Sequence, residues 1–376
     1  MPEPLRIVVV SALSIDSGSY LRACRIARAL ECAGAHVTVV KSMWSLPFML
    51  HFPLSVVLYL RALFIRCDVI IGLKPLPNVG LLLLIKKVFG TLTVVDIDDV
   101  DFGFRTGWLA TVNRTLQLPT PKRCDLVTYH TERLRPFIRE TFGVRDDKLY
   151  QLAQGVDLDP SVPSDMASRR ARREALGIDA HQKLVVYAAH LNIASDLDAI
   201  FDIVGIASRN AEGLRFLVVG GGPLERRFRR MACALGMDGL TTFTGYVPPA
   251  EVADYLRMGD AAIVYYKDIE VNYFRESMKL REMLALGLKV VCNDVGDLER
   301  FKDYTYQTGS DHEEVANQLV TVLRDGGDGR EARGMAYVRR CLDWKDIGAR
   351  LLHRITEARQ ASPASPVDAA ATGGLR

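Results

Sequence analysis

Hydrophobic residues occur in short continuous runs that alternate with longer stretches of helical periodicity. In the first part of the chain, a helical pattern covers 20–33, and apolar runs cover 7–10, 37–40, 69–71, 92–95 and 126–128. Continuous apolar runs of this length are typical of strands that are buried on both faces of a sheet. Their alternation with helices predicts a parallel sheet with helices on both faces.

A second alternation follows a polar interval at 154–168, which contains Gly, Pro, Asp and Ser and marks a linker. The later pattern predicts helices at 196–210, 224–235, 250–258 and 277–286, and strands at 184–188, 215–219, 241–244, 261–265 and 290–292. The sequence therefore predicts an α/β protein with two doubly wound, Rossmann-like domains. We expect these domains at 1–157 and 158–343, an amphipathic helix at 344–359, and a disordered tail at 360–376.

The composition is that of a folded protein large enough for two domains. The 376 residues are 49% hydrophobic and 25% charged, with a net charge of only +3. The basic clusters at 169–173 and 226–230 have helical spacing, which is typical of solvated helix faces, so we expect no nucleic-acid partner. The seven cysteines form no C-x-x-C pair, and no secretory signal is visible at the start. These features favour a cytoplasmic protein without structural zinc.

Residues 46–65 are nearly all apolar, but they include two prolines, a histidine and Arg61. A spanning helix needs roughly 20 apolar residues with few charges, so these prolines argue against one. Two interpretations stay open. The segment either lies on a membrane surface, with Arg61, Lys86 and Lys87 facing anionic headgroups at the inner side of the cytoplasmic membrane, or forms buried helices in the core.

The stretch 277–296 carries the strongest chemical signal. It predicts a short helix capped by Ser277, with Lys279 and Glu282 one turn apart, which ends at Gly287 before a buried strand. A helix start with its free N–H groups and a lysine suits a diphosphate, and a carboxylate on the same face suits the diol of a ribose. The alternative is a surface helix with a structural ion pair.

Other polar residues follow predicted strands, and ligands in such sheets bind beyond the carboxyl ends of the strands. Asp96, Asp98 and Asp99 follow one strand, where we favour binding of sugar hydroxyls over metal binding, with a turn or capping role as the alternative. His130 follows the next strand.

In the second domain, His190 and Asn192 follow the strand at 184–188, and Gly220 to Gly222 follow the strand at 215–219. The glycines permit close approach of a ligand, but they have neither Walker nor dinucleotide spacing. Each histidine taken alone is more often structural than catalytic.

Taken in order, several segments resemble the retaining glycosyltransferases of the GT-B fold, family 4. The segments that carry this resemblance are 17–30, 94–99, 124–134, 154–157, 218–223, 243–247, 277–283 and 287–296. It covers nearly the whole chain through Trp344, and it implies two domains facing across a cleft with the last helix crossing back to the first domain. It also implies that Glu282 binds ribose, that Ser277 and Lys279 face the diphosphate, and that Tyr246 and Val247 meet the base.

With the loop positions described above, the resemblance gives two sets of candidate residues. The candidate catalytic residues are Asp98, Lys279 and His130, and the candidate donor-binding residues are Gly18, His190, Asn192, Gly221, Tyr246, Val247, Arg275, Ser277, Lys279 and Glu282.

The chain departs from the family pattern at several of these positions. A second glutamate of the family is replaced here by Phe274, with Glu276 displaced by two. The loop after the first strand of the second domain lacks the family's arginine and lysine. Stabilisation of the departing diphosphate therefore depends on Lys279, Arg275 or a histidinium. Where many members have His-Asp, this chain has Asp98-Asp99.

The resemblance implies transfer of a sugar from a nucleoside-diphosphate sugar to a hydroxyl of a glycan or lipid-linked acceptor, in cell-surface glycan or glycolipid synthesis. It implies no metal and no other cofactor. The alternatives are a sugar-nucleotide 2-epimerase and a non-catalytic partner subunit of the same fold.

Overall fold

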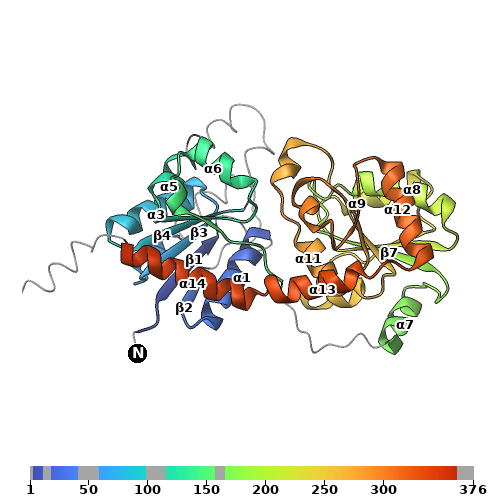
Figure 1. Ribbon diagram of the computed structural model, residues 1–376, viewed down its shortest axis with the longest axis horizontal. Coiled ribbons are helices and arrows are strands. Elements are labelled where there is room, and N and C mark those ends of the chain that lie inside the picture. Colours follow the sequence, from blue (N-terminus) through green and yellow to red (C-terminus); the bar gives the residue numbers. More distant parts are fainter. Residues whose placement is uncertain are drawn as a thin grey trace, which may run out of the picture. The chain divides into compact units, whose positions relative to one another are not determined.

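The computed structural model describes residues 3–11, 18–40, 59–98, 115, 117–156 and 166–361, and the chain divides into two compact units. Unit 1 contains Met1–Gln154 together with Trp344–Arg376, and unit 2 contains Gly155–Asp343 (Figure 1). Residues 157–165 of the predicted linker lie outside the described ranges. The prediction that the linker extends to residue 168 is wrong, because helix α7 (Met166–Ala175) already begins at Met166.

Unit 1 is built on a six-stranded sheet in the order β2-β1-β3-β4-β5-β6, and every pair of neighbours is parallel. The strands are β1 (Arg6–Ser11), β2 (His36–Val40), β3 (Val69–Leu73), β4 (Leu92–Ile97), β5 (Leu126–Tyr129) and β6 (Leu149–Gln151). The helices are α1 (Gly18–Cys32), α3 (Pro77–Val88), α5 (Pro119–Arg123) and α6 (Leu134–Phe142), with a 3-10 turn η2 (Asp146–Lys148). The short, half-buried β6 has no apolar run and was not predicted.

Unit 2 has a second parallel six-stranded sheet in the order β12-β11-β10-β7-β8-β9. Its strands are β7 (Lys183–Ala188), β8 (Leu214–Val219), β9 (Thr241–Phe243), β10 (Ala261–Val264), β11 (Val290–Asn293) and β12 (Tyr306–Thr308). After α7, its helices are α8 (Leu197–Asn210), α9 (Glu225–Ala234), α10 (Pro249–Leu256), α11 (Met278–Ala285), α12 (His312–Asp325) and α13 (Arg330–Cys341), with 3-10 turns η3 (Glu270–Phe274) and η4 (Gly296–Phe301). The two predicted doubly wound parallel sheets are confirmed.

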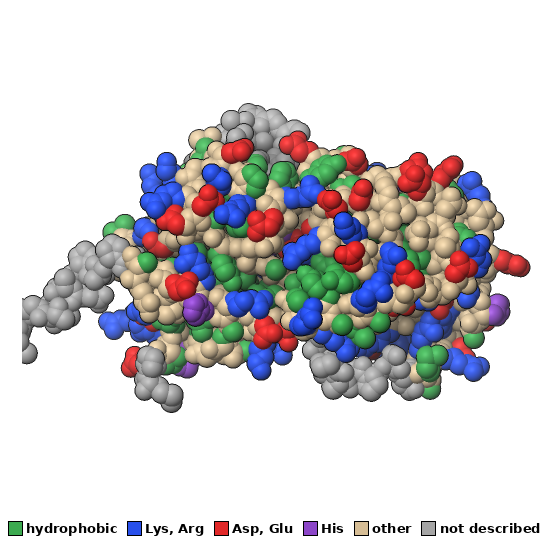
Figure 2. All heavy atoms as spheres, viewed as in Figure 1, with side chains coloured by type: hydrophobic (Ala, Val, Ile, Leu, Met, Phe, Trp, Pro, Cys, Tyr) green, Lys and Arg blue, Asp and Glu red, His purple; other side chains and the backbone are tan. Residues whose placement is uncertain are grey.

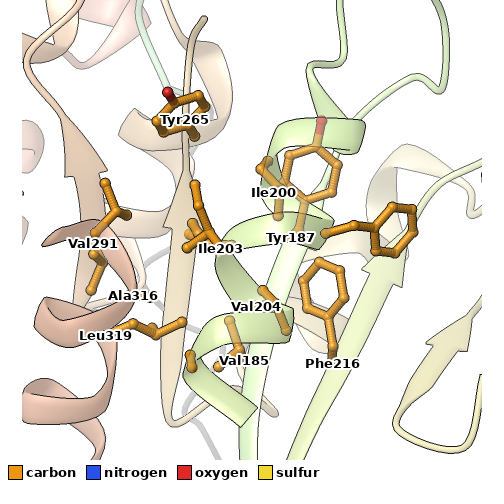
Figure 3. Packing of buried hydrophobic residues seen from close by; sticks show 14 of the residues in the cluster. Val185, Tyr187, Ile200, Ile203, Val204, Phe216, Tyr265, Val291, Ala316 and Leu319 are labelled. Carbon is orange, nitrogen blue, oxygen red and sulfur yellow. The ribbon is translucent and has the colours of Figure 1, made fainter. Parts of the chain in front are cut away.

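Apolar side chains from both elements fill the space between the second sheet and its helices. Figure 3 shows Val185 and Phe216 of the sheet packed against Ile200 and Val204 of α8. Leu319 of α12 belongs to the same cluster. Burial of each such side chain contributes about 1.5–3 kcal/mol. This core fixes the helices, and with them the loops at the strand ends.

Helix α14 (Trp344–Ala361) returns the chain to unit 1, where it packs along α1. Its buried residues Trp344, Ile347, Leu351 and Ile355 recur at helical spacing and belong to the core of that unit. Gly348 lies on the same face, and a Cβ added there would come within 2.3 Å of the Ala29 carbonyl oxygen. The two helices therefore approach as closely as a glycine allows.

Each sheet has one point at which the strand order reverses. In unit 1 it lies between β1 and β3, and in unit 2 it lies between β7 and β10. On either side of such a point the connections leave in opposite directions, so a crevice opens beyond the carboxyl ends of the strands. Loops after β1, β3, β7 and β10 are therefore where ligands are expected.

Most of the segment 46–65 lies outside the described residues, and its last part, 59–64, is helical. Lys86 is buried and its ammonium donates to the Ile65 carbonyl at 2.6 Å. The expectation that Lys86 faces lipid headgroups is therefore wrong, because the lysine is used inside unit 1. In the described ranges, no helix has both the length and the hydropathy to cross a membrane.

Acidic and basic side chains are mixed over the face seen in Figure 2.

The close approach of Gly348 to the Ala29 backbone leads to a testable prediction about stability. Gly348→Ala should lower the free energy of unfolding of unit 1 by about 1–3 kcal/mol, because α14 or the Ala29 backbone must shift. Calorimetry should show a melting temperature lower by roughly 2–4 °C per kcal/mol. Gly239→Ala is the matched control, since a Cβ there meets no atom within 4 Å. A Gly348→Ala protein as stable as the wild type would contradict the packing described for α14.

Candidate functional site

The start of α11 lies in the loop that follows β10 at the switch point of unit 2. Ser277 is its N-cap, and the Ser277 hydroxyl oxygen accepts from the Leu280 N–H at 3.1 Å, which confirms the predicted cap. The remaining first-turn N–H groups and the helix dipole give this end a positive potential.

A buried arginine holds the helix start in place. Arg281 is fully buried, and it donates to the Ser277 carbonyl and to the Asp297 carboxylate, both at 2.8 Å. It also pairs with Glu276 and lies over the Phe301 ring. The other Asp297 oxygen accepts from the Ser277 N–H at 3.1 Å, so both backbone groups of the cap are fixed. Glu276 therefore has a structural partner.

Lys279 and Glu282 project from the outer face of the same helix. Their ammonium and carboxylate groups are 2.6 Å apart, so the predicted neighbourhood is confirmed, and both side chains are partly exposed. An exposed i,i+3 pair contributes only about 0.2–0.5 kcal/mol. Either partner can therefore be exchanged for a ligand at small cost to the fold.

Three loops of unit 2 meet at the carboxyl ends of β7, β8 and β9. A Cβ at Gly220 or Gly222 would clash with the carbonyl oxygens of Ala189 and Leu191, and one at Gly221 would lie 2.8 Å from the Tyr246 nitrogen. The glycines are thus required by contact between the loops themselves. This arrangement brings the neighbours of Gly221 together in one loop cluster: His190, Asn192, Tyr246 and Val247.

Exposure differs among those residues. His190 and Tyr246 are exposed, whereas Val247 is buried. The Asn192 side-chain oxygen accepts from the Ala194 N–H at 2.9 Å, so it shapes its own loop. The residue after Asn192, Ile193, is an exposed apolar side chain at this edge of the sheet.

Arg275 links the loops after β7 and β10. Its guanidinium is 3.3 Å from the Asp196 carboxylate, donates to the Asn272 side-chain oxygen at 2.9 Å, and stacks over the Tyr266 ring. Asp196 has a left-handed backbone with φ 50°, and its pKa is raised because burial outweighs the nearby Arg275. Arg275 therefore has a defined position at the switch point.

In unit 1, the first carboxylate of the acidic run serves the core. Asp96 is buried at the end of β4, where Arg22 of α1 pairs with it at 2.7 Å and the Thr128 hydroxyl donates to it at 2.6 Å. Arg22 also donates to the Leu152 carbonyl and to the Gln154 side chain. Asp96 thus connects α1 to β4, β5 and the chain beyond β6, while Asp99 lies outside the described residues.

Asp98, two residues later, faces a different set of groups. It accepts from the Ser19 hydroxyl at 2.9 Å, and its other oxygen is 3.3 Å from the ammonium of Lys74, which follows β3. Burial raises the pKa of Asp98, but the electrostatic effects of Lys74, Arg22 and His130 and the Ser19 hydrogen bond outweigh burial, so this pKa lies below its usual value. His130 is buried beyond β5. Gly18 begins α1, with open space where a Cβ would stand.

The structure therefore divides the candidates between the two units, and all of them lie in or after loops that follow the strands. Gly18, Asp98 and His130 belong to unit 1, and the others belong to unit 2. Sequence reasoning missed three residues: Lys74, Arg281 and Asp196. A lysine directly after a continuous apolar strand is a usable signal for Lys74, but nothing local indicates the distant partners of Arg281.

Comparison with known proteins finds a family match within unit 2. Residues 182–325, from β7 to the end of α12, match the model of the glycosyl transferases group 1. A D-inositol 3-phosphate glycosyltransferase of Xylanimonas cellulosilytica is 28% identical over 255 residues, which are 64% of this chain and 58% of that protein. A GDP-mannose-dependent alpha-(1-6)-phosphatidylinositol monomannoside mannosyltransferase of Mycolicibacterium smegmatis is 26% identical over 274 residues, 70% of each.

Solved structures extend the likeness in fold to both units. Sucrose-phosphate synthase from Thermosynechococcus elongatus superposes with a TM-score of 0.77 over 95% of this chain and all of its own, at 15% identity. HepE of Anabaena, solved in complex with UDP-glucose, has a TM-score of 0.74 over 95% of this chain and all of its own, also at 15% identity.

The burial of Arg281 among carboxylates leads to a testable prediction about the stability of unit 2. Arg281→Met should lower the free energy of unfolding of unit 2 by about 3–5 kcal/mol, because it leaves Glu276 and Asp297 as buried carboxylates without their cation. Denaturant unfolding should show this loss. Arg300→Met, at an exposed position in η4, is the control and should change stability by less than about 0.5 kcal/mol. Equal stability of the two variants would contradict the anchoring role.

The family match covers all six strands of unit 2, and it includes the α11 stretch on which the resemblance most depends. The fold of both units agrees with the solved structures. Residues 182–325 are therefore similar to the glycosyl transferases of group 1, and both units have the GT-B fold of the solved structures.

Proposed function

We propose that the protein is a retaining glycosyltransferase that moves a sugar from a nucleoside-diphosphate sugar to a hydroxyl of its acceptor. The observation that carries the proposal is the start of α11, where the capped helix end, Lys279 and Glu282 lie together beyond the switch point of unit 2. The family match includes this stretch, and a sugar nucleotide offers the diphosphate and diol that such a surface recognises.

In this proposal each part of the donor has its own residues. The diphosphate binds at Ser277, Lys279 and Arg275, and the ribose hydroxyls bind Glu282. The base lies against the cluster of Gly221, Tyr246 and Val247, with His190 and Asn192 in the adjoining loop. The Lys279–Glu282 pair of the free protein is exchanged for phosphate and diol when the donor binds.

Charge develops on the departing diphosphate as the glycosidic bond breaks. Lys279, the α11 dipole and Arg275 stabilise that charge more in the transition state than in the bound donor, which is how they lower the barrier. Orientation of the two substrates supplies the remainder, so no protein nucleophile is needed. On the acceptor side, the hydroxyl oxygen bonds to the sugar carbon that the diphosphate leaves, and Asp98, near His130 and the Gly18 end of α1, accepts the hydrogen bond and then the proton of that hydroxyl.

The donors named for two similar proteins support a nucleoside-diphosphate sugar as the donor class of this protein. The Mycolicibacterium enzyme is named for GDP-mannose, and HepE was solved with UDP-glucose. GDP-mannose and UDP-glucose both contain a ribose and a diphosphate, which are the parts that the α11 surface recognises in this proposal.

We further propose a glycolipid or lipid-linked acceptor and a peripheral contact with the inner face of the cytoplasmic membrane. The Mycolicibacterium relative is named for a phosphatidylinositol monomannoside, which is a glycolipid, whereas the Xylanimonas relative is named for D-inositol 3-phosphate, which carries no lipid. Unit 1 also exposes a group of apolar side chains on helix 59–64 and on α3 with the residue after it, here named the α3 surface: Leu60, Phe64, Leu81, Val88 and Phe89. The Lys86–Ile65 hydrogen bond joins the two segments, and Arg61 beside them is exposed.

Donor binding tests the function directly. Glu282→Ala should weaken binding of UDP-glucose or GDP-mannose, whichever the wild type binds, by about 1.5–3 kcal/mol, roughly 10- to 150-fold, since a charged pair of hydrogen bonds is lost. Titration calorimetry measures the affinity for the nucleotide sugar. Glu251→Ala, which alters an exposed glutamate of α10, is the control and should bind the donor like the wild type.

Unchanged affinity in Glu282→Ala would remove Glu282 from the ribose site. A wild-type protein that binds a nucleotide sugar but never transfers the sugar to water or to any lipid or glycan acceptor would instead be a non-catalytic subunit. Conversion of the free donor to an isomer would indicate an epimerase.

Membrane contact is tested by flotation with vesicles of phosphatidylcholine and phosphatidylglycerol. The protein should float at low salt and less at high salt, because both apolar and ionic contacts contribute. The triple variant Phe64→Ser, Val88→Ser, Phe89→Ser should lose most of this binding. The control Leu235→Ser alters an exposed apolar residue of unit 2 and should float like the wild type. A wild-type protein that never floats would indicate a soluble acceptor.

A further inference from the structure

Lys74 is a buried lysine in a strained position, directly after β3 at the switch point of unit 1. Only 3% of it is exposed, and its backbone is left-handed with φ 65°. Among the described residues, Asp196 is the only other non-glycine with positive φ. The Lys74 N–H donates to the Asp96 carbonyl at 2.8 Å, which fixes this conformation. Strained backbone of this kind is concentrated at functional sites.

The ammonium of Lys74 pairs with Asp98 and not with Asp96 of the neighbouring buried ion pair. Asp96 already has Arg22 and the Thr128 hydroxyl as partners. Lys74 instead lies 3.3 Å from the Asp98 carboxylate, whose second oxygen accepts from Ser19. Two separate ion pairs therefore stand side by side at the carboxyl ends of β3 and β4.

We propose that Lys74 is a positioning residue of the transfer site, whose buried ammonium keeps Asp98 ionised and oriented to accept a hydrogen bond from the acceptor hydroxyl. This proposal rests on the proposed function. Lys74 itself need not touch the substrate, because its effect passes through Asp98.

Within the described residues, the polar and charged groups that face Asp98 come from several elements packed around it. Lys74 follows β3, Arg22 and the neutral Ser19 lie on α1, His130 follows β5, and Asp96 precedes Asp98 on its own strand. Burial favours the neutral acid, whereas the nearby cations favour the carboxylate, and the net result is a pKa below the usual value. Arg22 is bound to Asp96, so in the part of the chain that the structure describes Lys74 is the cation in direct contact with Asp98.

The sign of the pH effect follows from this balance. In the wild type Asp98 stays ionised from neutral pH down to below the usual range of a carboxyl group, so it does not limit transfer between about pH 5 and 8. Without the ammonium, the largest of the effects that lower the pKa of Asp98 is lost, so this pKa rises. The acid limb of kcat/KM should then move to higher pH.

The experiment compares Lys74→Met and Lys74→Gly with the wild type, as full chains, using the nucleotide sugar and acceptor that the wild type turns over. Glycine accepts the left-handed backbone, so Lys74→Gly removes the ammonium without strain. Both variants should show an acid limb raised by about 1–3 pH units. Ethylammonium should restore Lys74→Gly towards the wild-type profile, whereas ethanol should not. Lys74→Arg should keep the wild-type limb.

Two controls separate this effect from a general loss of structure. Nucleotide affinity, which belongs to unit 2, should be unchanged in both variants. Lys148→Met alters another lysine of unit 1, one that donates to the Lys122 and Cys124 carbonyls, and it should keep the wild-type limb.

The outcomes separate the two proposals. An unshifted acid limb in both Lys74 variants, with a wild type that transfers sugar, overturns the role of Lys74 alone. Absence of rescue by ethylammonium together with weakened nucleotide binding also overturns it, because the lysine is then structural. A wild type that binds nucleotide sugars without any transfer overturns the proposed function, and this proposal with it.

Discussion

Both sheets are entirely parallel, and this constraint decides where chemistry can occur in the molecule. In a parallel sheet all strands end at the same edge, so the residues that follow different strands are brought together there although they are far apart in sequence. Lys74 and Asp98 meet in this way after β3 and β4, and Asp196 meets Arg275 after β7 and β10. Reversal of the strand order between β1 and β3, and between β7 and β10, keeps the connecting helices from covering these positions.

Buried ion pairs then fix the geometry that the sheets make possible. Arg22 with Asp96 ties α1 to the first sheet, and Arg281 with Asp297 ties the start of α11 to the following 3-10 turn. Such pairs add little net stability over well-packed apolar residues, but losing one partner is costly because a buried charge is left alone. They therefore hold positions more than they stabilise the fold. At α11 the result is a rigid inner face with Arg281 and an exchangeable outer pair of Lys279 and Glu282.

Much of the fold was predictable because a buried parallel strand must be continuously apolar. The runs before Asp96, His190 and Gly220 gave the correct strands, with ends that differ from the observed bounds by one or two residues. β6 and β12, which have three residues each with half-buried or polar positions, were not predicted. The Ser277 cap and the Lys279–Glu282 pair were predictable because both are contacts within one turn of helix.

By itself the sequence determined the local structure, the division into two doubly wound units and the family resemblance, since these depend on periodicity and on motifs short enough to read along the chain. Tertiary structure decided which charges serve the core and which face a site. Asp96 and Asp98 are two residues apart in one acidic run, yet Arg22 takes the first and Lys74 the second. Lys86, which was expected to face headgroups, and Glu276, the displaced counterpart of the family's second glutamate, are engaged inside their units. The reason is that a side chain's role depends on partners from other strands and helices, and those partners are set by sheet order and packing.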